Sequence, residues 1–324
     1  MKTRVGVLRG GPSSEYEISL QSGATILKHL PEHYHPVDIF IDRNGAWHTQ
    51  GVRHEAHRIF PKLDVIINGL HGEYGENGEV QHLLESHGIP FSGSGRFACA
   101  LAMNKSLAKN IVGRMGIKTP AHRLIRREEM ESLTPVVEEL FRSFPQPSVV
   151  KPRGGGSSLG ITIVGTPEEL AHALDQAFLM CDAVLIEEYI GGKEATCSIL
   201  EDFRGEHWYA FLPSEVRIPP ESLFFDYFAK YSGKSEILCP GNFTNEEKRE
   251  LQDSARRVHE ALGLRHYSQS DFKVHPKRGI YFIEVDALPH LAEVHSPYLK
   301  ALHAVGASTP EFLDHVARLA LARG

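Results

Sequence analysis

Two apolar runs that carry three acids and flank a turn occupy residues 267–286 of the chain: YSQSDFKVHPKRGIYFIEVD. The turn lies at residues 276–279, so the two runs are predicted to form an antiparallel pair of strands. Glu284 and Asp286 are two residues apart and share one strand face, and the hairpin brings Asp271 opposite them. Such carboxylates repel each other unless a cation lies between them, and magnesium prefers hard oxygen ligands. The stretch therefore predicts a metal site, with three solvated surface acids as the alternative.

Strands alternate with helices in the first third of the chain. Short apolar runs predict strands at 5–8, 37–41 and 63–67. Apolar residues at helical spacing predict helices at 19–30 and 78–87. This alternation predicts an open α/β sheet with crossover helices. Sheets of this kind bind ligands beyond the carboxyl ends of their strands.

Two groups of small residues divide the rest of the chain. They lie at 91–95 (FSGSG) and at Gly191-Gly192, so we predict domains at 1–94, 95–190 and 191–324. A single helix is expected at about 96–114, directly after the first of these boundaries.

Bulk composition excludes several classes of protein. The 324 residues allow two or three domains, and a net charge of -6 gives no reason to expect a nucleic-acid or membrane partner. The four cysteines are far apart, which argues against a disulfide framework or a zinc site and fits a reducing compartment. No apolar run is long enough for a membrane span or a signal peptide, so we expect a cytoplasmic protein.

A glycine-rich loop at 154–160 follows Lys151 at the end of a predicted strand. Backbone N–H groups of such a loop can surround phosphate oxygens, and Ser157 and Ser158 add hydroxyl donors. The spacing is not that of a Walker A loop, and a structural hairpin turn is the alternative. Lys105 could supply a second charge to phosphate, although by itself it is typical of a solvated helix position.

The remaining candidates are weaker when taken alone. The stretch 185–194 is typical of a nucleoside-binding hinge or of a strand end with solvated acids. Glu15 precedes a predicted helix, where the helix dipole favours an acid, and it could equally bind a substrate ammonium. His71 is one of 19 histidines and could be purely structural.

Taken together, these segments resemble the D-alanine–D-alanine ligase family of the ATP-grasp superfamily, in the family's order along nearly the whole chain. The matching segments are 7–15 (VLRGGPSSE), 70–72 (LHG), 75–78 (GENG), 92–95 (SGSG), 103–105 (MNK), 150–152 (VKP), 156–160 (GSSLG) and 225–231 (FDYFAKY). The resemblance implies an α/β, three-domain ATP-grasp architecture. It would have an N-terminal open parallel sheet and hold ATP between α+β central and C-terminal domains.

The resemblance also implies roles at the nucleotide. Lys105, Lys151 and Ser158 would hold phosphates, and the adenosine would lie against Glu187, Glu188, Tyr189, Ile190 and Glu194. Two Mg²⁺ ions, which Mn²⁺ can replace, would be held by Asp271, Glu284 and Asp286. The implied reaction joins two D-alanines through an acyl phosphate, for peptidoglycan precursor synthesis, and we also expect a homodimer.

On the substrate side, Glu15 would anchor the ammonium of the first D-alanine, with His71 nearby. Ser157 and Tyr231 would connect to Glu15, Lys230 would reach the transferred phosphate, and Ser296 would bind a substrate carboxylate. Gln269 stands where the family usually has an oxyanion-binding Arg.

Other departures from the family lie close to the same place. Asp286 replaces the usual Asn, His290 replaces a Gly, and Phe228 replaces an acid. These departures leave two further hypotheses open: an ATP-grasp ligase with a different acceptor, and a nucleotide-binding pseudoenzyme.

Overall fold

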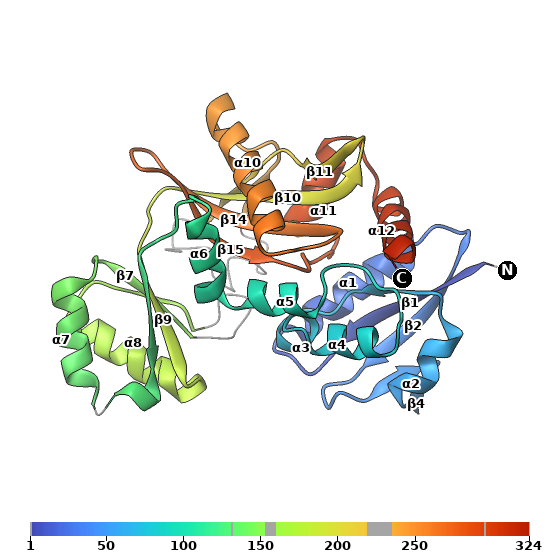
Figure 1. The fold of residues 1–324 in the computed structure, drawn as a ribbon, viewed down its shortest axis with the longest axis horizontal. Coiled ribbons are helices and arrows are strands. Elements are labelled where there is room, and N and C mark those ends of the chain that lie inside the picture. The colour runs from blue at the N-terminus through green and yellow to red at the C-terminus, as the bar shows by residue number, and fades with distance from the viewer. Residues whose placement is uncertain (1, 131, 153–159, 219–234, 295, 324) are drawn as a thin grey trace.

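Three β-sheets, each with its own helices, make up the protein. The computed structural model describes residues 2–130, 132–152, 160–218, 235–294 and 296–323, and statements about structure refer to these. In Figure 1 the N-terminal sheet (blue) and the central sheet (green) lie at opposite ends of the view, and the C-terminal sheet (yellow to orange) lies above and between them. None of the helices in these ranges is long and apolar enough to cross a membrane.

The N-terminal sheet has the strand order β4-β3-β2-β1-β5. Its strands are β1 (Thr3–Gly10), β2 (Tyr34–Ile41), β3 (Trp47–Thr49), β4 (Val52–His54) and β5 (Val65–Asn68). The accompanying helices are α1 (Tyr16–His29), α2 (Ala56–Ile59), α3 (Glu73–Glu76) and α4 (Glu79–Ser86), with a 3₁₀ turn at Phe60–Lys62. β1 pairs in parallel with β2 and β5, as predicted, whereas β3 and β4 extend the sheet as an antiparallel edge that the sequence reasoning missed.

The central sheet, β6-β9-β7-β8, has antiparallel pairings throughout the described strands. Its strands are β6 (His122–Arg126), β7 (Ser148–Pro152), β8 (Thr162–Val164) and β9 (Ala183–Glu188). The helices α7 (Leu133–Ser143) and α8 (Pro167–Met180) pack on it, and a 3₁₀ turn lies at Arg127–Glu129. α8 begins with a capping box in which the Thr166 hydroxyl accepts from the Glu169 N–H and the Glu169 carboxylate accepts from the Thr166 N–H.

The C-terminal sheet confirms the predicted hairpin. It contains β10 (Lys193–Phe203), β11 (Glu206–Ala210), β12 (Ser214–Arg217), β13 (Glu236–Leu238), β14 (Tyr267–His275) and β15 (Gly279–Asp286). β14 and β15 are antiparallel, with Asp271 opposite Glu284 and Gln269 opposite Asp286. The helices of this part are α10 (Asn245–Ala261), α11 (Pro297–Ala304) and α12 (Thr309–Arg323).

Two helices, rather than the single one predicted, connect the first sheet to the others. α5 (Arg96–Met103) ends at Asn104, and α6 (Lys105–Arg114) begins there, because the Asn104 side chain accepts a hydrogen bond from the Leu107 N–H and caps α6. Both helices contribute buried side chains to the core under β10, β14 and β15. They therefore pack with the C-terminal sheet, and the boundaries at 94/95 and 190/191 stay predictions.

The N-terminal and C-terminal parts share a hydrophobic core. Val5 and Val7 of β1 lie in one cluster with Tyr298 of α11 and with Phe312 and Leu313 of α12. α12 (red in Figure 1) therefore lies against the first sheet, although it comes from the far end of the chain. This shared core fixes the first sheet relative to the hairpin of acids.

Candidate active site

Two adjoining cavities lie beside the acid hairpin. The first cavity is open to solvent and reaches from the start of α1 to β14 and β15; its polar lining residues include Glu15, His71, Glu76, Lys105, Thr196, Gln269, Asp286 and His290. The second cavity lies between the central and C-terminal sheets and is lined by Lys151, Glu187, Glu188, Tyr189, Ile190 and Lys273, among others. Glu194, Asp271 and Glu284 line both cavities, so the acids lie where the two meet.

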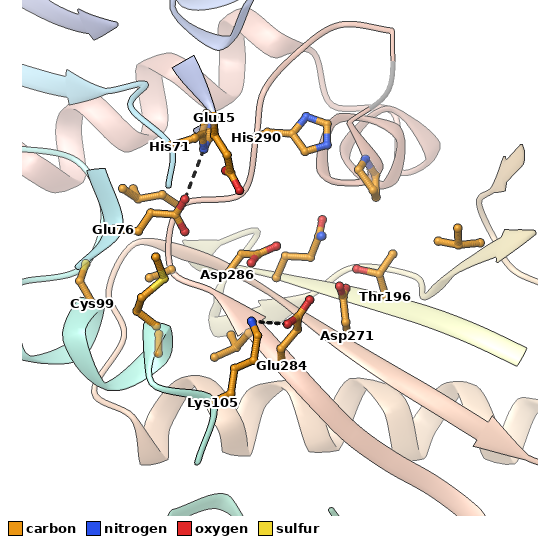
Figure 2. Close-up of a pocket in the computed structure, with 18 of the residues that line it drawn as sticks. Glu15, His71, Glu76, Cys99, Lys105, Thr196, Asp271, Glu284, Asp286 and His290 are labelled. Atoms are coloured by element: carbon orange, nitrogen blue, oxygen red, sulfur yellow. Dashed lines mark ion pairs between the residues drawn. The ribbon is translucent and has the colours of Figure 1, made fainter. Parts of the chain in front are cut away.

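The three predicted metal ligands lie on one face of the hairpin. Figure 2 shows Asp271, Glu284 and Asp286 pointing into the first cavity. The Lys105 ammonium lies 2.5 Å from the Glu284 carboxylate, so the first residue of α6 reaches this acidic edge. Among the described residues, no three His, Cys, Asp or Glu side chains already form a closed metal-binding group. Magnesium is usually bound by one or two carboxylates together with substrate phosphates, and the metal-binding role of these acids stays a prediction.

Glu15 is positioned by the turn that follows β1. A Cβ on Gly10 would lie 2.2 Å from the Ile41 carbonyl oxygen, and its φ is +89°, so this turn requires glycine. The Glu15 N–H donates to the Ser13 hydroxyl (3.2 Å), which itself donates to the His71 carbonyl (2.7 Å). Glu15 is buried and makes no capping bond with its side chain, and Figure 2 shows the carboxylate directed into the first cavity.

His71 links helix α1 to the loop that follows β15. Its Nε2 lies 2.8 Å from the Ser22 hydroxyl, which accepts a hydrogen bond from the Leu291 N–H (3.0 Å). Its Nδ1 lies 3.7 Å from a Glu76 oxygen. Burial lowers the pKa of His71 to about 4, although the nearby Glu15 carboxylate acts in the opposite direction. His71 is therefore neutral at pH 7 and acts as a hydrogen-bonding group.

The pKa of His71 makes stability depend on pH in a definite window. Between pH 6.5 and 4 the unfolded chain protonates this histidine while the folded protein does not, so stability falls as the pH falls. We expect a loss of about 3 kcal/mol from this residue across the window. Urea unfolding at pH 7 and at pH 4.5 measures it: His71→Gln should lose less stability between the two than the wild type.

A change at an exposed histidine provides the control for this effect. His35→Gln should keep the wild-type dependence on pH, since that side chain lies at the surface. Equal losses of stability in wild type and His71→Gln would contradict the assignment. The pKa of His266 is also lowered by burial to about 4, so the difference between variants, and not the total slope, is the relevant quantity.

The second cavity contains the predicted nucleotide residues. Glu188 of β9 pairs with Arg278 in the hairpin turn at 2.7 Å and so connects the central and C-terminal sheets, whereas Glu194 of β10 pairs with Lys273 of the neighbouring strand β14 at 2.5 Å, within the C-terminal sheet. Glu187 is 2 % exposed and lies between two lysines, Lys151 at 2.6 Å and Lys109 at 2.7 Å. The prediction that Glu187 contacts adenosine remains open, because its two oxygens already have cationic partners.

The acceptor side of the first cavity carries the departures from the family. Gln269 is buried at the wall of the cavity, and its Oε1 has no hydrogen-bond partner in the described structure. The His290 ring also lines the cavity, 6.5 Å from the His71 ring. The Ser296 hydroxyl caps α11 by accepting from the Leu299 N–H and donates to the His290 carbonyl at 2.6 Å. Ser296 thereby supports the loop that carries His290.

Four predicted residues lie outside the described ranges: Ser157, Ser158, Lys230 and Tyr231. Their roles stay predictions from the resemblance. The sequence reasoning in turn missed Lys109, Ser22 and Thr196, whose buried side chains lie at or next to the cavities. A signal for Lys109 was available, since it lies four residues after Lys105 and hence on the same helix face.

Comparison with known protein families shows which family the chain belongs to. The family model for the C-terminal part of D-Ala–D-Ala ligases matches residues 111–318, and the model for the N-terminal part matches residues 4–61. The chain belongs to the D-alanine–D-alanine ligase family. Because these ligases have the ATP-grasp fold, the predicted fold class is confirmed.

Individual members of the family match over most of their length. A D-alanine–D-alanine ligase of Geobacter sulfurreducens is 40 % identical over 291 residues, covering 89 % of this chain and 84 % of that protein. The enzyme of the same name from Fervidobacterium nodosum is 36 % identical, covering 96 % of each chain. Among solved structures, the VanG D-Ala:D-Ser ligase of Enterococcus faecalis superposes with a TM-score of 0.85 at 28 % identity, covering 99 % of this chain and all of that one.

Proposed function

We propose that this chain is an ATP-dependent ligase that joins two D-alanines, forming ADP and phosphate, for the synthesis of a peptidoglycan precursor. One observation carries the proposal: Asp271 and Glu284 lie where a cavity containing Glu15 meets a cavity containing Lys151. An amino acid held by its ammonium at Glu15 would thus extend toward the place where a nucleotide's phosphates would lie. Family membership supports the same reaction.

The residues of the second cavity suit ATP. Lys151 supplies positive charge for phosphates in the second cavity and Lys105 supplies it from the adjoining first cavity, and apolar side chains such as Val149, Ile161 and Ile190 line the part of the second cavity that would take the base. A chain with a net charge of -6 needs such local cations, because its overall field repels an anionic substrate. The residues that would hold Mg²⁺ are Asp271, Glu284 and Asp286, and two ions bound there with the phosphates would neutralise charge on the transferred group.

With the amino acid in the first cavity and ATP in the second, the ligation would proceed in two steps. The carboxylate of the first D-alanine attacks the γ-phosphorus of ATP, and ADP leaves. The amine of the second D-alanine then attacks the acyl carbon, and phosphate leaves after a tetrahedral oxyanion has formed. Gln269 and His290 line the cavity on this side and offer N–H donors to that oxyanion. Neutral His71, tied to Ser22, keeps the α1 end of the cavity in place without adding charge.

A different second amino acid is the second candidate, and the position of His290 favours it. An imidazole at the wall of the first cavity narrows the space for the acceptor and adds a hydrogen-bonding group. The similarity to a D-Ala:D-Ser ligase makes D-serine the first alternative to test. The expected homodimer belongs to the same proposal and is measured by light scattering during size-exclusion chromatography.

Gln269 provides a prediction about the oxyanion. Replacing it with Arg adds a charged donor beside the tetrahedral centre, and removal of one such donor costs roughly 10²–10³ in rate in other enzymes. Because Gln already donates, we expect Gln269→Arg to raise the rate of dipeptide formation by about tenfold or less. Gln269→Leu, which has no donor, should lower it; an unchanged or lower rate with Arg would argue against the role.

The experiment that tests the function is phosphate release from ATP with single amino acids and then with pairs. Release that requires D-alanine supports the proposal. Release that requires another nucleophile supports the second candidate, and nucleotide binding without release under any pair would leave a pseudoenzyme.

A further inference from the structure

A buried cluster of three charges lies behind the second cavity. The Lys109 and Lys151 ammonium groups approach opposite oxygens of Glu187, at 2.7 and 2.6 Å. The side chains of Lys109 and Glu187 are 0 % and 2 % exposed, and Lys151 is 8 % exposed. Lys151 and Glu187 line the second cavity, whereas Lys109 lines neither cavity. Lys109 can therefore affect a ligand in the second cavity only through Glu187 and the other residues that it contacts.

Stability alone does not account for a lysine in this position. Removing charged groups from water costs several kcal/mol, and apolar replacements of buried ion pairs are often neutral or stabilising. Burial lowers the pKa of Lys109 to about 8, whereas the Glu187 charge acts to raise it. Burial raises the pKa of Glu187, but the two lysines outweigh it and hold that pKa near 2. The carboxylate is thus ionised and shared between two cations.

Lys109 also contacts one strand of each of two sheets and reaches a third strand through Glu187. Its ammonium donates to the Ile283 carbonyl on β15, next to Glu284, while Glu187 lies on β9 and Lys151 on β7. One helical turn earlier on α6, Lys105 contacts Glu284 itself. Helix α6 thereby fixes the spacing between the acidic edge and the strand that carries Lys151.

We propose that Lys109 is a positioning residue for the nucleotide site. It shares the Glu187 carboxylate with Lys151, and part of the Lys151 charge therefore stays available to the phosphates of ATP. This inference rests on one part of the proposed function, namely that the second cavity binds ATP. Without Lys109, Glu187 would have Lys151 as its one described cationic partner and would hold that ammonium more tightly. ATP would then have to compete with Glu187 for the same charge.

A double-mutant cycle tests this sharing through the dissociation constant for ATP, measured by calorimetry with Mg²⁺ present. Lys109→Met keeps an unbranched apolar side chain and should weaken ATP binding about tenfold. In a Glu187→Gln background, where no carboxylate competes for Lys151, adding Lys109→Met should change the constant by less than about threefold. Loss of long-range positive charge alone would instead weaken binding equally in both backgrounds.

Lys118→Met is the matched control. Lys118 follows α6 and donates to the Arg278 carbonyl at 2.9 Å, so the change removes a lysine charge near the same sheets without touching Glu187. It should leave ATP binding within about twofold of wild type. Thermal unfolding of each variant separates loss of fold from loss of affinity, and Lys109→Gln, which keeps a donor for Ile283, replaces Lys109→Met if that variant is unfolded.

The outcomes separate this inference from the function itself. Failure of the wild type to bind ATP would contradict the proposed function. Binding by the wild type, together with an unchanged constant in folded Lys109→Met or with equal weakening in both backgrounds, would overturn the role of Lys109.

Discussion

Replacing Asp271 with Asn is expected to lower ATP turnover in the presence of D-alanine by about 10²–10³-fold, because several kcal/mol of charge stabilisation at the transferred phosphoryl group is lost. Asp271 lies opposite Glu284 on the hairpin and, like Glu284, lines both cavities, where the phosphates and the first amino acid would meet. The amide keeps the size of the side chain and one oxygen but removes the negative charge that attracts Mg²⁺. Steady-state ADP formation, measured over a range of Mg²⁺ concentrations, gives the result.

The matched control for Asp271→Asn is the same change at Asp286. Asp286 lies on the same face, opposite Gln269, and Asn is the residue that the family usually has there. We therefore expect Asp286→Asn to stay within about tenfold of wild type. Equal effects at the two positions, or a folded Asp271→Asn with wild-type turnover, would contradict the assignment of the acid edge.

Glu15→Gln should raise the KM for D-alanine by about 10–100-fold. A hydrogen bond to a charged group contributes about 1.5–3 kcal/mol, and the amide cannot offer the ionic part of that contact to an ammonium. The buried carboxylate points into the first cavity beside His71, and Glu15 is not part of the lining of the second cavity. The KM for ATP should consequently change much less than the KM for D-alanine, which initial-rate measurements with each substrate varied in turn would show.

Glu17→Gln is the control for this change on the same helix. Glu17 lies in the first turn of α1, but its exposed carboxylate pairs with Arg43 at 2.9 Å and lines neither cavity. It should leave both KM values close to wild type. A parallel rise in the KM for ATP in Glu15→Gln would indicate a general loss of structure at the start of α1 and would remove the support for an ammonium anchor.

Local pattern was enough to predict the hairpin and the parallel core of the first sheet. The spacing of Glu284 and Asp286 and the short turn before them determine which side chains share a face. The prediction of one helix at 96–114 was wrong, because apolar spacing continues through the break and only the capping bond of Asn104 marks it. The packing of α12 against β5 and α1 depends on contacts between the two ends of the chain, which periodicity does not encode.

In the candidate site, too, the sequence predicted residues that line the cavities but not the buried residues that hold them in position. The strand pattern singled out the three acids, the resemblance strengthened the roles of Glu15, Lys105 and Lys151, and the structure brings all of them to two adjoining cavities. The partners that hold these residues were missed, since Ser22 and Lys109 look like ordinary helix residues until the sheets pack around them. Glu187 shows the difference most clearly: its position on β9 was foreseen, but its two lysine partners come from β7 and α6.

Mass spectrometry of the product formed from D-alanine under saturating ATP and Mg²⁺ tests the proposed ligase activity. We expect D-alanyl-D-alanine, with one ADP and one phosphate released for each dipeptide. A folded protein that binds ATP but forms no D-alanyl-D-alanine under these conditions would contradict the proposed activity.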